Sequence, residues 1–130
     1  MTATALLSHW IEYLREERRF ADNSLDAYQR DVAAFLNFLA NHIGGEPSTG
    51  DLAELAPRDL RAYLAYRRQG SDALADRSIS RALAAIRSFY RYLERRHGIT
   101  NPSLQLVRGP KLNRLLPRPV SEDGVYALMQ

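Results

Sequence analysis

The sequence contains no cysteine, and this absence excludes several kinds of chemistry. Disulfide bonds, a thiolate nucleophile and cysteine-ligated metal sites are all impossible without it. The chain also lacks a run of about eighteen consecutive apolar residues and a basic N-terminal segment leading into an apolar stretch, so we expect neither a membrane span nor a secretion signal. A chain without cysteine suits a reducing compartment, and we expect it to work in the cytoplasm.

Histidine is scarce, and the three histidines, His9, His42 and His97, lie far apart with no carboxylate pairing that would suggest a metal or catalytic site. The tyrosines fall mostly on or beside apolar stripes, which is typical of core positions and not of a nucleophile: Tyr13, Tyr28, Tyr63, Tyr66, Tyr90, Tyr92 and Tyr126. We therefore expect no catalytic residue, no metal and no other cofactor in this chain.

Charge is unevenly distributed along the chain. Residues 1–76 hold eight arginines and twelve acidic residues, a balance of −4, whereas residues 77–118 hold ten basic residues and one glutamate, a balance of +9. The net charge of +3 hides this asymmetry. One strongly basic section indicates a polyanionic partner. Nucleic acid is favoured over a membrane, because no amphipathic tail with exposed bulky apolar residues accompanies the basic section.

Apolar residues recur at spacings of three and four through most of the chain, which predicts an all-α fold. The expected helices run from about Thr4 to Arg19, from Asp22 or Asn23 to about His42, from Pro57 to just before Gly70, from Asp76 to Gly98 and, as a short one, around Pro102 to Val107. Between the second and third, paired glycines, a proline and small polar residues predict an exposed loop over residues 43–51.

The segment 76–98 predicts a helix with two unlike faces. Its apolar stripe is formed by Ile79, Leu83, Ile86, Tyr90 and Leu93. A turn of about 100° per residue places a different set on the opposite face: Arg77, Arg81, Arg91 and Arg95, with the small Ala84 and Ser88. A solvated face usually mixes charges, but this helix has six arginines and one acid, so its outer face predicts contact with phosphates. Asp76 or Ser78 is expected to cap its start, and Gly98 to end it.

The second helix is expected to begin with a polar, narrow outer surface. If Asn23 is the cap, Asp26 falls at the third helical position, a variant of the capping box. Asn23, Ala27 and Arg30 then lie away from the apolar side. Such a helix start can seat a phosphate or enter a major groove, although caps of this kind are common.

Three prolines and four basic residues without an acid predict an extended basic linker over residues 108–120, whose alternative is a disordered tail. Ser121 then favours the start of a new helix over residues 121–130, which ends with nothing to pack against. The expected organisation is a helical domain over residues 1–107, the linker, and the first helix of a truncated further domain.

These pieces together resemble the N-terminal core-binding domain of tyrosine recombinases, specifically the bacterial Xer type and related phage integrases. The resemblance rests on the ordered set NSLDAYQRD (residues 23–31), SRALAAIRSFYRYL (80–93), NPSLQLV (101–107) and PKLNRLLPRPVSEDGVYALM (110–129). Each piece alone is common, but their order and spacing match the family over essentially the whole chain.

The resemblance implies an orthogonal bundle of four to five helices, the integrase SAM-like core-binding domain, which forms one half of a clamp around duplex DNA. The family's tyrosine nucleophile and its arginines, lysine and histidines belong to the catalytic domain, so this fragment is not expected to be an enzyme by itself. The implied partners are a double-stranded recombination site and other recombinase protomers assembled on it, as in DNA integration or chromosome dimer resolution. The isolated fragment is expected to be monomeric and to bind DNA weakly.

The family places the starts of the second helix and of the helix over residues 76–98 near the major groove. Carried over to this sequence and joined to the basic face and linker, the candidate DNA contacts are Asn23, Ser24, Ala27, Arg30, Arg77, Ser78, Ser80, Arg81, Arg87, Arg91, Lys111 and Arg114. Arg87 sits on the flank between the two faces. Arg81→Ala is expected to weaken DNA binding without unfolding the domain.

Three other functions compete with this one. A helical module with a basic face could bind an acidic protein partner, and salt-sensitive protein binding without affinity for duplex DNA would identify it. A complete small enzyme is disfavoured, since no nucleophile and base converge. A helix-turn-helix regulator is disfavoured because the connection before Asp76 is longer than the three or four residues of that motif.

Overall fold

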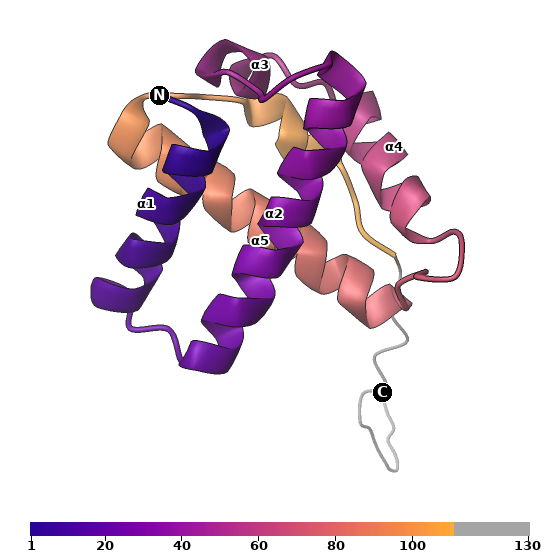
Figure 1. The fold of residues 1–130 in the computed structure, drawn as a ribbon, viewed down its shortest axis with the longest axis horizontal. Helices are drawn as coiled ribbons and strands as arrows, with labels where there is room; N and C mark the ends of the chain where they lie inside the picture. Colours follow the sequence, from indigo (N-terminus) through magenta and orange to yellow (C-terminus); the bar gives the residue numbers. More distant parts are fainter. Residues whose placement is uncertain (111–130) are drawn as a thin grey trace, which may run out of the picture.

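A computed structural model describes residues 1–110, which form five α-helices and one 3-10 helix. In chain order these are α1 (Ala3–Glu16), α2 (Asp22–Ile43), α3 (Thr49–Ala53), α4 (Pro57–Arg67), α5 (Asp76–His97) and η1 (Pro102–Leu106). No strand occurs in this part of the chain, so the predicted all-α fold is confirmed. In Figure 1, α5 crosses behind α1 and α2, and α4 lies on the far side of α2 from α1.

The core lies where α5 packs against α1, α2 and α4. The apolar stripe predicted for α5 is buried along its whole length. Trp10 of α1 meets Phe89 of α5 edge-on, with ring centroids 5.3 Å apart, and Phe35 of α2 meets Tyr63 of α4 in the same geometry at 5.3 Å. All four rings are fully buried. Close-packed aromatic contacts of this kind hold the helices as a rigid scaffold for the surface.

Both long helices begin after an alanine. Ala21 precedes α2 and Ala75 precedes α5, and neither helix start has a side-chain cap. Of the two predicted starts of this helix, Asp22 is confirmed, and the alternative in which Asn23 caps the helix with Asp26 is wrong. The predicted cap at Asp76 or Ser78 is wrong, because α5 already begins at Asp76. Gly98 does end α5 as predicted, with φ at 66° in the left-handed region that favours glycine.

The segment expected to be an exposed loop contains the start of a further helix. Ser48 Oγ accepts a hydrogen bond from the Asp51 N–H at 3.1 Å, and Asp51 Oδ2 accepts one from the Ser48 N–H at 2.9 Å. This reciprocal capping box starts α3 at Thr49, and Pro47 before it is buried. The prediction for residues 43–51 is therefore wrong in part, because glycine and proline content masked the cap.

Buried polar contacts fix α3 against the rest of the fold. Tyr90 of α5 donates its hydroxyl proton to the Leu52 carbonyl at 2.8 Å. Asn101, just before η1, donates from its side-chain amide to the same carbonyl at 3.1 Å and to the Leu55 carbonyl at 2.8 Å. The end of α3 is thus tied both to α5 and to the segment that follows it.

The chain leaving η1 returns along α5 towards the start of that helix (Figure 1). A Cβ added at Gly109 would lie 3.3 Å from Leu83 Cδ2 and 3.7 Å from Ser80 Oγ, so this segment lies directly on α5.

Residues 111–130, with most of the predicted linker and the helix expected after Ser121, lie outside the described residues. The short helix predicted around residues 102–107 is present as η1, a 3-10 helix. The first helix ends at Glu16, earlier than predicted.

Candidate nucleic-acid interface

A stripe of arginines and small residues runs along the outer side of α5. We call it the basic stripe and define it as Arg77, Arg81, Ala84, Ser88, Arg91 and Arg95. The four arginines and Ala84 are exposed and Ser88 is half-buried, as the helical spacing predicts. The small residues leave room between the guanidinium groups, so that a phosphate can approach more than one of them.

The start of α2 presents a polar surface. Asn23, Ser24 and Arg30 are exposed, and Ala27 is half-buried. Ala21 offers no side-chain oxygen to the amides of the first turn, so those amides point outwards without a side-chain cap. A helix start of this kind has a partial positive charge that favours an anion.

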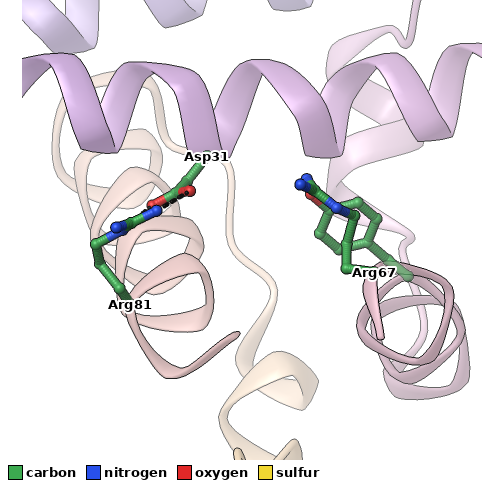
Figure 2. A network of polar contacts seen from close by, with 4 residues as sticks. Asp31, Arg67 and Arg81 are labelled. Atoms are coloured by element: carbon green, nitrogen blue, oxygen red, sulfur yellow. Dashed lines mark hydrogen bonds and ion pairs between the residues drawn. The ribbon is translucent and has the colours of Figure 1, made fainter. Parts of the chain in front are cut away.

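Arg81 joins the two helices of this surface through a buried carboxylate. Its Nε donates to Asp31 Oδ2 at 2.8 Å and its Nη2 donates to Asp31 Oδ1 at 3.0 Å. Figure 2 shows the two side chains pointing at each other, Asp31 from α2 and Arg81 from α5, with Arg67 to one side. The side chain of Asp31 is 5% exposed and that of Arg81 is 42% exposed. Hydrogen bonding to Asp31 raises the pKa of Arg81, so the guanidinium stays charged.

This ion pair gives Arg81 a structural role in addition to its place on the basic stripe. That Arg81→Ala weakens DNA binding without unfolding the domain stays a prediction, but the structure adds a cost in stability, because removal of Arg81 leaves a buried carboxylate without its partner. Asp31 accepts from two of the five N–H groups of Arg81, which leaves both N–H groups of Nη1 and one of Nη2 for an external acceptor. Arg81 is therefore a structural residue whose outer edge remains on the basic stripe.

Asp31 is not among the candidate site residues that the sequence predicts. One signal was available, since Asp31 lies three residues after Tyr28 and four before Phe35, on the side of α2 that the apolar pattern predicts to be buried. Among residues 1–110 it is the one buried charged residue. A carboxylate placed inside an apolar stripe requires a cationic or hydrogen-bonding partner, but the identity of that partner is set by the fold.

Arg87, Ser78 and Ser80 are less exposed than the arginines of the basic stripe. Arg87 is half-buried and donates from Nη2 to the Val107 carbonyl, so it anchors the segment after η1 to α5. Ser80 is half-buried next to Gly109, and Ser78 is half-buried near the start of α5. Arg77 and Arg91 lie on the open surface, while Lys111 and Arg114 lie outside the described residues.

Within residues 1–110 there is no cluster of three or more His, Asp or Glu side chains that could hold a metal ion. The rings of His9 and His97 do stack, with centroids 6.5 Å apart. Tyr63, Tyr90 and Tyr92 are buried. In the same range, no helix has the length and apolar character needed to cross a bilayer.

Comparison with known proteins bears on this helical region. The family described as "Phage integrase, N-terminal SAM-like domain" matches residues 7–97. A tyrosine recombinase XerC of Methylobacterium nodulans is 47% identical over 119 residues, which cover 92% of this chain and 36% of that protein. The tyrosine recombinase XerC of Rhizobium meliloti is 43% identical over 114 residues, covering 87% of this chain and 35% of that protein. No solved structure gives a significant match.

The chain spans about a third of the length of these relatives, at 36% and 35%. The family match takes in α1 from Leu7 onwards, α2, α3, α4 and all of α5 to His97, which are the elements that form the core and the basic stripe. On that match, the chain belongs to the family of phage integrase N-terminal SAM-like domains.

Proposed function

We propose that this chain binds duplex DNA as the N-terminal part of a tyrosine recombinase. The observation that supports this most is the basic stripe, on which four exposed arginines lie along α5 and three of them, Arg77, Arg91 and Arg95, take no part in the ion pairs found in residues 1–110. Phosphate neutralisation by such a surface gives most of the affinity of a DNA-binding domain, and a few side chains then read base edges.

The proposed contact surface combines the start of α2 with the basic stripe. Asn23, Ser24, Ala27 and Arg30 would face the groove from α2, and Arg77, Ser78, Arg81 and Arg91 from α5. Ser80 and Arg87 remain predictions at the edge of this surface, since each contacts the chain after η1. Lys111 and Arg114 remain predicted contacts of the linker.

The relatives named tyrosine recombinase extend this proposal to the whole protein. Strand cleavage would be done by a catalytic domain outside this chain, so this part would position the DNA and perform no chemistry. Its partners would be a duplex recombination site and other protomers on that site, in DNA integration or chromosome dimer resolution. Such work would take place in the cytoplasm.

Replacement of one exposed arginine tests this proposal. Arg77→Gln should weaken binding to a duplex several-fold and leave the melting temperature unchanged, because Arg77 is exposed and takes no part in the ion pairs found in residues 1–110. Arg61→Gln removes the same charge from the exposed surface of α4 and is the matched control. Equal affinities of the wild type, Arg77→Gln and Arg61→Gln chains for duplex DNA would contradict the proposed surface.

A further inference from the structure

A small pocket lies between the end of α1 and the outer side of α5. Six residues line it: Tyr13, Arg18, Ser88, Arg91, Tyr92 and Arg95. Its volume is about 40 Å³. One water needs roughly 10–15 Å³ of such a space, so the pocket has room for a small anionic group and not for a base or a sugar.

The polar groups that line this pocket favour an anion. Arg18, Arg91 and Arg95 are exposed, and no carboxylate is among the lining residues. The ion pairs found within residues 1–110 involve none of these three arginines. Ser88 adds a hydroxyl that can donate a hydrogen bond. Three arginines and one serine around so small a space suit the many acceptors of a phosphate group.

The acid closest in sequence to Arg18 is already engaged. Glu17 accepts a hydrogen bond from Arg96 Nη2 at 2.6 Å, and the Arg96 guanidinium lies over the Tyr13 ring at 4.8 Å. Glu17 is therefore paired with Arg96 and not with Arg18.

The wall of the pocket is formed by packed aromatic rings and a backbone hydrogen bond. The Tyr13 and Tyr92 rings pack at 5.1 Å between centroids, and the Tyr92 hydroxyl lies 3.2 Å from His97 Nε2. The Arg18 N–H donates to the Tyr13 carbonyl at 3.2 Å, which fixes the backbone of Arg18 beside the pocket. A preformed wall lowers the entropic cost of ordering a bound group.

We propose that this pocket seats one phosphate group of the DNA backbone. The inference rests on the proposed function, and it extends the contact surface along the second half of α5 to a residue outside the helices predicted to enter the groove. Ser88, Arg91 and Arg95 belong to the basic stripe, and Arg18 reaches the same group from the connection between α1 and α2. Since Arg18 and Arg95 share one phosphate, their contributions to the salt dependence are not independent.

The test is a salt titration of duplex binding by the full chain and by three variants: Arg18→Gln, Arg95→Gln and the double variant. Each single change should reduce the magnitude of the log–log salt slope by about 1 at most, with an affinity loss of about 3- to 10-fold. The double variant should lose no more than about 1 in total, because both arginines contact the same single phosphate. Arg61→Gln is the charge-matched control, and melting temperatures should be unchanged throughout.

Different outcomes separate this inference from the proposed function. Slope losses that add to about 2 in the double variant would overturn the shared seat in favour of two separate contacts. Duplex binding that falls in Arg77→Gln but not in the pocket variants would overturn the seat and leave the proposed function standing. A wild-type chain with no salt-dependent duplex binding would remove the proposed function itself. Loss of affinity for a polyglutamate peptide, with duplex binding retained, would assign the pocket to an acidic protein.

Discussion

At the residue scale, the Asp31–Arg81 pair connects the stability of the fold to the proposed DNA surface. A carboxylate that is 5% exposed loses most of its hydration on folding, and two short hydrogen bonds from Arg81 replace it. The pair also joins α2 to α5, the two helices of the proposed DNA surface. The charge of Arg81 is therefore held in a fixed position, and it does not depend on a flexible side chain.

Arg81→Ala is expected to destabilise the fold by about 1–3 kcal/mol, because Asp31 would remain buried without its donor. Thermal or urea unfolding measures this loss. Arg77→Ala is the control, since Arg77 is exposed on the same stripe and its removal should change stability by less than about 0.5 kcal/mol. Equal stabilities of these two variants would show that the pair contributes nothing to the fold.

Tyr90 makes the stability of the fold sensitive to high pH. Burial raises the pKa of Tyr90 above its ordinary value of 10.0. The folded state therefore favours the protonated phenol, which donates to the Leu52 carbonyl. The stabilising contribution is complete below pH 10 and is lost as the pH rises from 10 towards the folded pKa, because ionisation then favours the unfolded chain.

Tyr90→Phe should reduce this loss of stability at alkaline pH. At neutral pH the substitution should lower the free energy of unfolding by about 1 kcal/mol, because one hydrogen bond is lost. The Leu52 carbonyl keeps a partner, since Asn101 still donates to it. Unfolding measured at pH 7 and above pH 10 compares the two conditions. Tyr66→Phe is the control, since Tyr66 is 58% exposed and its variant should follow the wild type. An alkaline loss that is identical in Tyr90→Phe and wild type would assign it to other groups.

At the scale of elements, the long helices were predictable and the contacts between them were not. The bounds of α5 follow from an uninterrupted apolar stripe and from Gly98, both of which are local signals. The five-residue α3 was missed because its capping box, Ser48 and Asp51, sits among glycine and proline. The Asp31–Arg81 contact joins residues 50 positions apart, a separation at which helical periodicity has no information.

The capping box of α3 gives an element-scale prediction. Ser48→Ala removes the acceptor for the Asp51 N–H, so it should destabilise the fold by about 1 kcal/mol and lower the melting temperature by several degrees. Ser71→Ala, in the exposed turn after α4, should leave the melting temperature within error of the wild type. If the melting temperature of Ser48→Ala equals that of the wild type, α3 owes its stability to Leu52 and Tyr90 and not to its cap.

At the scale of the whole molecule, the segment that follows η1 lies along the most basic helix, α5. The acidic residues lie mostly before α5, where residues 1–76 have a balance of −4. The segment after η1 runs back along α5 towards its first turn, held by Arg87 and lying against Ser80. The last described residues therefore lie beside the start of the basic stripe.

This arrangement predicts the salt dependence of the complete surface. If the basic stripe and the start of α2 neutralise about four to six phosphates, the log–log slope of duplex affinity against salt should be about −4 to −5. A fluorescence titration from low to moderate salt measures that slope. Arg61→Gln, on α4, should keep the wild-type slope, whereas Arg77→Gln should reduce its magnitude by about 1. A flat affinity would mean that the arginines of α5 do not contact phosphates, and it would favour an acidic protein as the partner of this face.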